Sequence, residues 1–417
     1  MLLIIRAKLH RAGIRIRRAG NSALTAATFA GCGVLAAAGC APPAMADATM
    51  KINDDTSISV GIGLRGTYTS TENGAPNGTS YSNSFAAQSV SPNFTGRYKI
   101  FKIFLHYDKS PGGPAATGNE NLRMLDGIGQ IEPSEEFNIW MGRMLVPTDR
   151  GNLYGAYYSS TWSPPVIAGN YPQIFGGRDD GAMVWGTLLN GKLNYSAGAF
   201  NGHNRAAGLG NQGNSLLYAG RLQVNFLDAE TGYWRPSSYL GTKDILSVAL
   251  AGNTQSNGVG TAAAPHTLSI WSADALFEKK LAGGYVPTLE AIYYKYNLGG
   301  KLDCNSGEPG SPACPVGVDN VGGQVAGNAL AVSALFMFPQ KVGWGQFQPW
   351  VRYQKYNRDV SQTTNKGTDY GLNYLIDGFN MKIVGIFTKF DDSRKPLLVP
   401  ATVASTKQFL LGVQFQY

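Results

Sequence analysis

The sequence predicts an all-β protein, a transmembrane antiparallel β-barrel with sixteen strands as the favoured number. Two observations carry this prediction. The last twelve residues, TKQFLLGVQFQY, alternate apolar with mostly polar side chains and end on the aromatic Tyr417. A strand places alternate side chains on opposite faces, so this one has one face for lipid and one for water. Strand-like runs of about ten residues also recur along the chain, joined by connections that alternate between short and long.

The sixteen runs differ in length but share apolar alternation and flanking turn residues. They are 56–68, 81–90, 95–108, 120–131, 137–145, 180–189, 192–201, 215–226, 244–254, 266–278, 284–297, 323–338, 346–358, 368–376, 380–390 and 404–417. Tight turns are expected at Ser91-Pro92-Asn93, Pro133-Ser134-Glu135-Glu136, Asn190-Gly191, 279–283 and Asp377-Gly378-Phe379, with 227–243 and 339–345 as longer members of this set. The long connections are 69–80, 109–119, 146–179, 202–214, 255–265, 298–322, 359–367 and 391–403.

Composition argues against other classes of protein. The chain has 53 glycines, 21 tyrosines and only 15% charged residues, which is unusual for a helical or disordered protein. No apolar stretch of about eighteen residues runs without a polar interruption, so transmembrane helices are not expected.

Residues 1–46 have the pattern of a signal peptide, which leaves 47–417 as a single barrel domain. Six basic residues precede an Ala-rich segment at 23–38, and Ala44-Met45-Ala46 forms a small-residue cleavage site. A start downstream of Met1 and a lipoprotein site at Cys40 stay open as alternatives. Without the leader, 29 basic and 27 acidic residues leave a net charge of +2, which gives no support for nucleic-acid binding.

The exported part of the chain contains two cysteines, Cys304 and Cys314, in the Pro/Gly-rich stretch DCNSGEPGSPACP. Such a stretch cannot be a strand, and in an oxidising compartment a disulfide that closes this loop is the favoured interpretation. Two thiols without neighbouring histidines do not fill a zinc shell, so no metal site is expected.

The third long connection, 146–179, is the longest and contains four tyrosines and a tryptophan. Its aromatic content argues against disorder, and long segments of this kind are usually functional. A wide barrel has a lumen to narrow, so we expect this loop to fold inward. An ordered loop that covers the rim or contacts another subunit is the alternative.

At IEPSEEFNIWMGRMLVP (131–147) and DYGLNYLIDGFNMKIVGIFTKF (369–390) the chain resembles bacterial outer-membrane porins, most of all the phosphate-selective porin O/P group. The first stretch is similar to that group's strand, charged turn, strand and Gly-x-x-x-x-Pro entry to the third loop. The second is similar to its Gly-Leu-Asn-Tyr hairpin, and QPWVRYQKY (348–356) agrees. The resemblance implies a homotrimer in the outer membrane of a Gram-negative bacterium, surrounded by lipid, that passes small hydrophilic solutes or ions without a cofactor.

The predicted constriction departs from that group in its charges. Anion-selective members are expected to carry many basic residues along the pore. The third loop and the first residue of the run after it hold a mixed set instead, namely Asp149, Arg150, Arg178, Asp179 and Asp180. Anions such as phosphate therefore remain one option among small solutes and ions.

Side-chain parity gives further candidates for the lumen wall. A charge at the lipid midplane costs ~2–4 kcal/mol, so charged residues opposite apolar ones should face the lumen. The candidates are Arg65, Arg221, Asp274, Glu278 and Arg352. Wall ion pairs remote from the constriction are the alternative role for these residues.

Three hypotheses about function follow. A passive diffusion channel is favoured, and no enzymatic activity is expected because no hydrolase or phosphate-loop motif occurs. A surface-binding or adhesion barrel is the second. An outer-membrane hydrolase is the third, and it predicts a strand-borne Ser or Asp beside His106.

Overall fold

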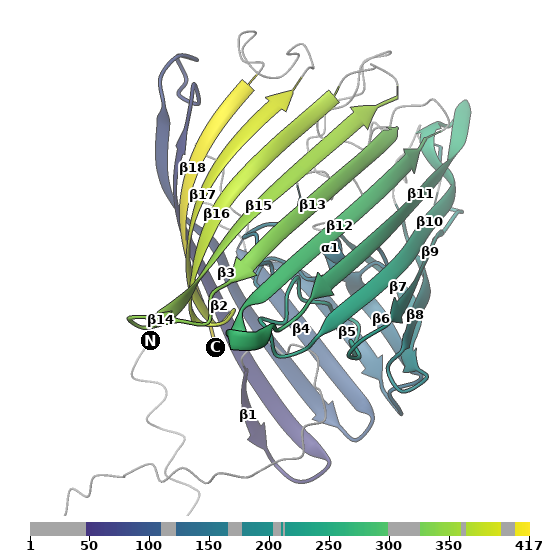
Figure 1. Ribbon diagram of the computed structural model, residues 1–417. Coiled ribbons are helices and arrows are strands. Elements are labelled where there is room, and N and C mark those ends of the chain that lie inside the picture. Colours follow the sequence, from purple (N-terminus) through teal and green to yellow (C-terminus); the bar gives the residue numbers. More distant parts are fainter. Residues whose placement is uncertain are drawn as a thin grey trace, which may run out of the picture. The chain divides into compact units, whose positions relative to one another are not determined.

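The computed structural model describes residues 47–109, 122–165, 177–202, 210–211, 213–298, 326–359, 364–392 and 405–417. Strands dominate these ranges, and each pairs antiparallel with its neighbours along the chain (Figure 1). Within the described residues the helical elements are α1 (Arg150–Leu153) and a 3-10 turn, η2 (Ala282–Gly284). Among the described residues no helix combines the length and apolarity needed to cross a bilayer.

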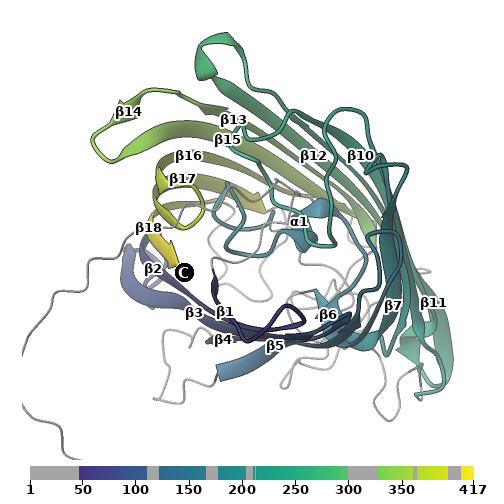
Figure 2. The same cartoon turned by 90° about the horizontal axis from the view of Figure 1, so that it is seen from below.

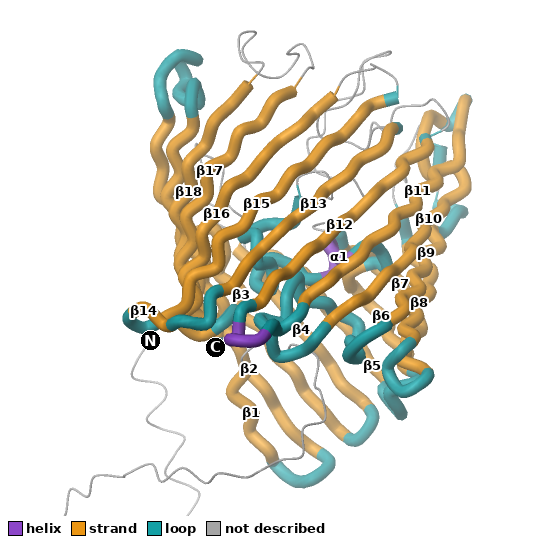
Figure 3. Tube along the Cα trace, in the orientation of Figure 1, coloured by secondary structure: helices purple, strands orange, loops and turns teal. Residues whose placement is uncertain are grey.

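The strands form one sheet, which Figure 3 shows as a continuous tilted wall. Their bounds are β1 (Asp47–Lys51), β2 (Thr56–Thr71), β3 (Ser82–Tyr98), β4 (Phe101–Lys109), β5 (Leu122–Ile131), β6 (Asn138–Leu145), β7 (Arg178–Leu188), β8 (Leu193–Phe200), β9 (Leu217–Asn225), β10 (Ile245–Thr261), β11 (Ala264–Glu278), β12 (Val286–Asn297), β13 (Gly327–Met337), β14 (Lys341–Val342), β15 (Gly345–Arg358), β16 (Thr364–Asp377), β17 (Met381–Asp392) and β18 (Ser405–Gln416).

The sheet closes on itself, because the last strand pairs with β2 from Gln408↔Thr71 to Gln416↔Gly63. The short strands β1 and β14 lie at the rim, and the other sixteen of the eighteen form the ring. Tyr417 and Ile62 exchange backbone hydrogen bonds of 2.6 and 2.9 Å at the seam. We call the end of the ring that holds Tyr417 the turn end and the opposite end the loop end.

Exposure alternates along the strands as the closing strand predicts. Phe409, Leu411 and Phe415 are exposed on the outer face of β18, whereas Gln414 is fully buried on the inner face. A ring with apolar side chains outside and polar ones inside satisfies all its backbone groups without an open edge. The sixteen-stranded barrel is therefore confirmed.

One predicted tight turn, Ser91-Pro92-Asn93, is wrong, because β3 continues through it to a turn at Lys99 and Ile100. Ile62 opposes Pro92 in the register and uses its own N–H and C=O toward Tyr417. The backbone nitrogen of Pro92 therefore points away from β2 and toward β4. The hydrogen-bonded pairing of β3 with β4 ends one residue short of it, at Asn93↔His106. A proline is tolerated there because no hydrogen-bond partner requires its missing N–H.

A predicted long connection, 255–265, is also wrong. Strands β10 and β11 extend into it and meet at a two-residue turn, Ala262-Ala263. Gly258 lies in a register shift between Gln255 and Val259, and Gly260, just beyond it, has a φ of +85°. Extra residues of this kind form a bulge without ending the strand.

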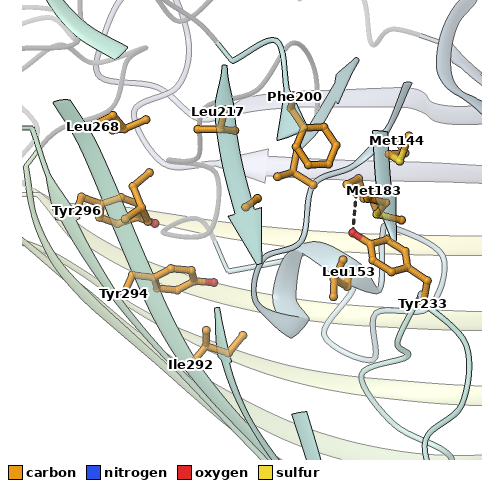
Figure 4. Packing of buried hydrophobic residues seen from close by; sticks show 14 of the residues in the cluster. Met144, Leu153, Met183, Phe200, Leu217, Tyr233, Leu268, Ile292, Tyr294 and Tyr296 are labelled. Atoms are coloured by element: carbon orange, nitrogen blue, oxygen red, sulfur yellow. Dashed lines mark hydrogen bonds between the residues drawn. The ribbon is translucent and has the colours of Figure 1, made fainter. Parts of the chain in front are cut away.

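The inner face is not uniformly polar. An apolar cluster covers the inner wall of β4 to β13 and reaches β15, and it includes Trp140, Trp185 and Leu217. Figure 4 shows that Leu153 of α1 and Tyr233 of the β9–β10 connection contribute to the same cluster. The ring therefore contains packed chain as well as its own wall.

Candidate functional site

The first part of the third long connection, residues 146–163, is here called the loop-end segment. It follows β6 and lies against the inner wall, and Figure 2 shows α1 inside the ring of strands. Asp149 caps α1 by accepting a hydrogen bond from the Asn152 N–H at 3.3 Å. The same carboxylate accepts a 2.7 Å hydrogen bond from the Tyr294 hydroxyl of β12. This side-chain contact joins the segment to the wall at its beginning.

Wall side chains donate hydrogen bonds to the backbone carbonyls of the loop-end segment. A buried segment without regular secondary structure needs such donors, because an unpaired buried C=O costs free energy. The donor pairs are Arg221 to Thr148 (3.0 Å), Gln414 to Tyr157 (2.9 Å), Lys382 to Ser159 (2.6 Å), Asn373 to Ser160 (2.8 Å), Arg65 to Trp162 and Arg352 to Ser163 (2.6 Å). Strands on opposite sides of the closing seam thus hold one continuous stretch of chain.

Aromatic rings add apolar contact to these hydrogen bonds. The guanidinium carbon of Arg65 lies 3.7 Å from the centre of the Trp162 ring, a cation–π distance. A Cβ at Gly412 would lie 2.7 Å from the same ring, and one at Gly63 would lie 2.4 Å from Tyr157. Glycine at both wall positions therefore lets the rings approach the backbone.

Arg150 is the most connected charge of the site. Its side chain is fully buried and donates to Glu230 at 2.5 Å, to Ser247 at 3.0 Å and to the Pro236 carbonyl at 2.9 Å. Its backbone N–H donates to Asp274 at 3.1 Å. Burial disfavours the charged guanidinium, but the Glu230 and Asp274 carboxylates outweigh this and raise the pKa of Arg150 above its ordinary value.

Glu230 is equally buried and forms the other half of this pair. Burial alone would raise its pKa, but the adjacent Arg150 charge dominates and lowers the pKa of Glu230 to about 2. The carboxylate also accepts a 2.7 Å hydrogen bond from Gln223. The pair is therefore ionised at neutral pH.

We expect this pair to make stability depend on pH only under acidic conditions. A depressed folded-state pKa contributes stability that is complete above the ordinary value of 4.5 and is lost as pH falls through about 2. The difference in melting temperature between wild type and Glu230→Gln should therefore stay constant from about pH 7 to about pH 5 and shrink below that. Thermal unfolding followed by tryptophan fluorescence measures it. A difference that already vanishes near pH 6, or persists unchanged at pH 2, would contradict the assignment.

The five predicted wall residues all lie on the inner face and are buried. Arg221 forms an ion pair with Asp274, Arg352 pairs with Asp369 at 2.7 Å, and Glu278 accepts a 2.6 Å hydrogen bond from Ser238. Together with Arg65, they bind the loop-end segment or the β9–β10 connection. These residues hold the two segments that fold into the ring. The sequence analysis considered only a lumen-lining role and remote ion pairs in the wall for them.

The five predicted constriction residues are only partly brought together. Asp149 and Arg150 lie in the loop-end segment. Asp179 lies near the start of β7 instead, where it accepts a 2.6 Å hydrogen bond from the N–H of Gly202, which follows β8. Arg178 binds Asp126 of β5 at 3.1 Å. Asp180 pairs with Arg143 at 2.8 Å, and both side chains are partly exposed.

Arg143 and Asp180 share a face with Met141, which is 66% exposed, while Trp140 on the other parity is buried. This pair therefore lies on the outer side of the wall. Residues 166–176 of the third connection, His203, the predicted disulfide Cys304–Cys314 and the predicted signal peptide 1–46 fall outside the described residues.

Sequence reasoning missed several buried charges of the interior, namely Glu230, Arg235, Glu290, Asp369 and Lys382. Three of them lie on strands, where parity could have identified them. Lys382 stands between the apolar Met381 and Ile383, and Asp369 precedes Tyr370. Glu230 and Arg235 lie in a connection, for which side-chain parity gives no orientation.

A chain of hydrogen bonds links Ser91, His106 and Asp126 on three adjacent strands. The Ser91 hydroxyl lies 2.6 Å from His106 Nε2, and His106 Nδ1 lies 2.9 Å from the Asp126 carboxylate. This is the arrangement that the hydrolase hypothesis predicts beside His106. Arg178 binds the same carboxylate through two hydrogen bonds of 3.1 Å.

No family model matches the chain. No curated protein matches it either. Solved structures do: an anion-selective porin from Comamonas acidovorans covers 87% of this chain and 100% of its own, with a TM-score of 0.54 and 10% identity. Salmonella typhi OmpF covers 89% and 100%, with a TM-score of 0.55 and 12% identity. The outer-membrane channel DcaP of Acinetobacter baumannii covers 89% and 100%, with a TM-score of 0.53 and 12% identity.

The chain has the fold of bacterial porins. The similarity covers the whole length of each of these porins, but at 10–12% identity it concerns the fold alone. The finer resemblance to the phosphate-selective porin O/P group is matched by no family model and stays a prediction.

Proposed function

We propose that the chain forms a water-filled channel for passive diffusion of small hydrophilic solutes or ions across the outer membrane of a Gram-negative bacterium. The observation that carries the proposal is the closed ring with an apolar outer face and a charged inner face. Porin-type barrels of the same fold support it. The test is conductance of the purified protein in a planar bilayer, where the absence of stepwise openings would count against a channel.

The loop-end segment is the proposed constriction. Its position against the inner wall, and its anchoring through Arg150, Asp149 and six carbonyl contacts, support this role. A constriction held by buried ion pairs and wall donors keeps its width, which a size-selective pore requires. Of the predicted constriction residues, Asp149 and Arg150 fit this role and Asp180 does not, because it lies on the outer side of the wall.

We expect a weak preference for cations. Among the described residues, eight acidic and six basic side chains are buried in the interior, most of them in mutual contact. Such a nearly balanced set gives a weak field, and no dense basic lining favours phosphate. In a tenfold KCl gradient the reversal potential should have the sign of cation selectivity and stay far below the ideal value of about 59 mV. A strong anion-selective potential would contradict this charge assignment.

The assembly and processing of the channel follow from the same proposal. Residues 1–46 act as the removed leader, and the barrel assembles as a homotrimer, as the structurally similar OmpT of Vibrio cholerae does in its trimer form. Native gels and cross-linking in detergent report the number of subunits. A surface-binding barrel remains the alternative if no conductance is found.

A serine hydrolase is the second candidate function, and the Ser91–His106–Asp126 chain is the observation that favours it. Two features oppose it. Arg178 already binds Asp126, and Ser91 is 2% exposed beside a hollow that has no room for a water-sized molecule, whereas ordinary ligand sites have volumes of about 300–1,000 Å³. A fluorophosphonate probe would label wild type and Ser89→Ala but not Ser91→Ala if the hydrolase assignment holds, and absence of labelling removes it.

A further inference from the structure

The connection between β9 and β10, residues 226–244, is here called the turn-end segment. It is much longer than its neighbours at the same end of the ring, 189–192 and 279–285. Its middle does not stay at the rim, because Glu230, Tyr233 and Ser237 are at most 4% exposed. The segment therefore enters the ring from the end opposite to the loop-end segment.

The two segments meet inside the ring and are joined mainly through backbone groups. The Ser160 N–H donates to the Ser237 hydroxyl at 2.7 Å, and the Ser237 N–H donates to the Tyr158 carbonyl at 3.1 Å. The Arg150 guanidinium donates to the Pro236 carbonyl at 2.9 Å. The loop-end segment and the turn-end segment, which enter the ring from opposite ends, thus form a continuous interface.

The wall holds the turn-end segment as it holds the loop-end segment. Glu278 of β11 accepts hydrogen bonds from the Gly241 N–H at 2.8 Å and from Ser238 at 2.6 Å. The Tyr233 hydroxyl donates to the Leu145 carbonyl at 2.7 Å, and its ring packs edge-on against Trp140. The turn-end segment is therefore held to the wall by hydrogen bonds to a carboxylate and by apolar ring contacts.

We propose that the turn-end segment is a second restriction element of the channel, locked to the loop-end segment by the buried Arg150–Glu230 pair. This inference rests on the proposed function. The constriction is then built from both ends of the ring, and Arg150 and Glu230 are positioning residues that set its width without binding solute. Loss of the pair releases the turn-end segment while the sixteen-stranded wall stays closed.

The test compares Glu230→Gln with Asp228→Asn. Both variants remove one negative charge from the turn-end segment, but Asp228 is exposed at the rim, where it accepts a 2.8 Å hydrogen bond from the Asp244 N–H. We expect Glu230→Gln to increase single-channel conductance ~2-fold, because a wider constriction passes more ions. Asp228→Asn should conduct like wild type.

Limited chymotrypsin digestion gives a readout that does not depend on conductance. Tyr233 and Trp234 are packed in the interior of wild type, so cleavage beside them should appear in Glu230→Gln and be absent from wild type and Asp228→Asn. If wild type does not conduct, the proposed function fails, while digestion still tests the lock. If wild type conducts and Glu230→Gln matches Asp228→Asn in conductance and resistance, the lock is overturned.

Heat-dependent gel mobility reports whether Glu230→Gln folds. If it does not fold, a second variant tests the same proposal. Ser237→Ala removes the hydroxyl that accepts from Ser160 and donates to the Tyr158 carbonyl at 3.1 Å, but it leaves the ion pair intact. It should raise conductance and chymotrypsin cleavage in the same direction by a smaller factor. Wild-type values in both measurements would overturn the proposal.

Discussion

Replacement of Arg150 by alanine is expected to lower the free energy of unfolding by about 3–5 kcal/mol, because it leaves the carboxylate of Glu230 buried without its partner. The Arg150 side chain is fully buried and makes two further hydrogen bonds, to Ser247 and to the Pro236 carbonyl. Its loss also removes two of the contacts between the loop-end segment and the turn-end segment, those with Glu230 and Pro236. Urea unfolding in lipid vesicles, followed by tryptophan fluorescence, measures the change.

Arg143→Ala is the matched control for this prediction. Arg143 pairs with Asp180, but 26% and 40% of the two side chains are exposed. Exposed pairs contribute about 0–1 kcal/mol, so this variant should unfold almost like wild type. Equal losses in both variants would show that Arg150 is not a buried anchor.

Much of the barrel follows from local sequence. In β9, Arg221 and Gln223 are buried while Leu222 and Val224 are exposed, and the amino-acid sequence shows the same alternation of polar and apolar residues. It predicts which face contacts lipid and how many strands exist. Turn residues were less informative. Pro92 suggested a turn but lies inside β3, at a position where neither neighbouring strand needs a backbone N–H from it.

The site was harder to predict because it depends on contacts between distant residues. Parity correctly separates Arg352 from Tyr353, but nothing in β15 indicates that Arg352 donates to the carbonyl of Ser163. Glu230 lies in a connection without periodicity, so its pairing with Arg150, eighty residues away, has no local signal. The apolar cluster on the inner face was hard to predict for the same reason. Trp140 and Trp185 alternate along their strands like lipid-facing residues, but they pack against the distant Tyr233.

The inward segments change how the wall charges are understood. A wide ring has many inward positions to fill, and water alone would leave them without fixed partners. Here arginine and lysine side chains satisfy the carbonyls of irregular chain, while acidic side chains satisfy its N–H groups and hydroxyls. The nearly balanced charge of the interior is therefore a consequence of holding two segments, as well as a determinant of ion selectivity.

Leu250→Arg should destabilise the barrel in lipid by ~2–4 kcal/mol, because it places a charge on the outer face near the bilayer midplane. Leu250 is 62% exposed in the regular part of β10 and opposes Leu222, which is 51% exposed on β9. Leu227→Arg, at the turn end beyond β9, should cost only about 0–1 kcal/mol, because charge near the interface remains hydrated. Urea titration in vesicles compares the two. Since both substitutions add the same side chain to an exposed site, equal stabilities would mean that this face does not contact hydrocarbon.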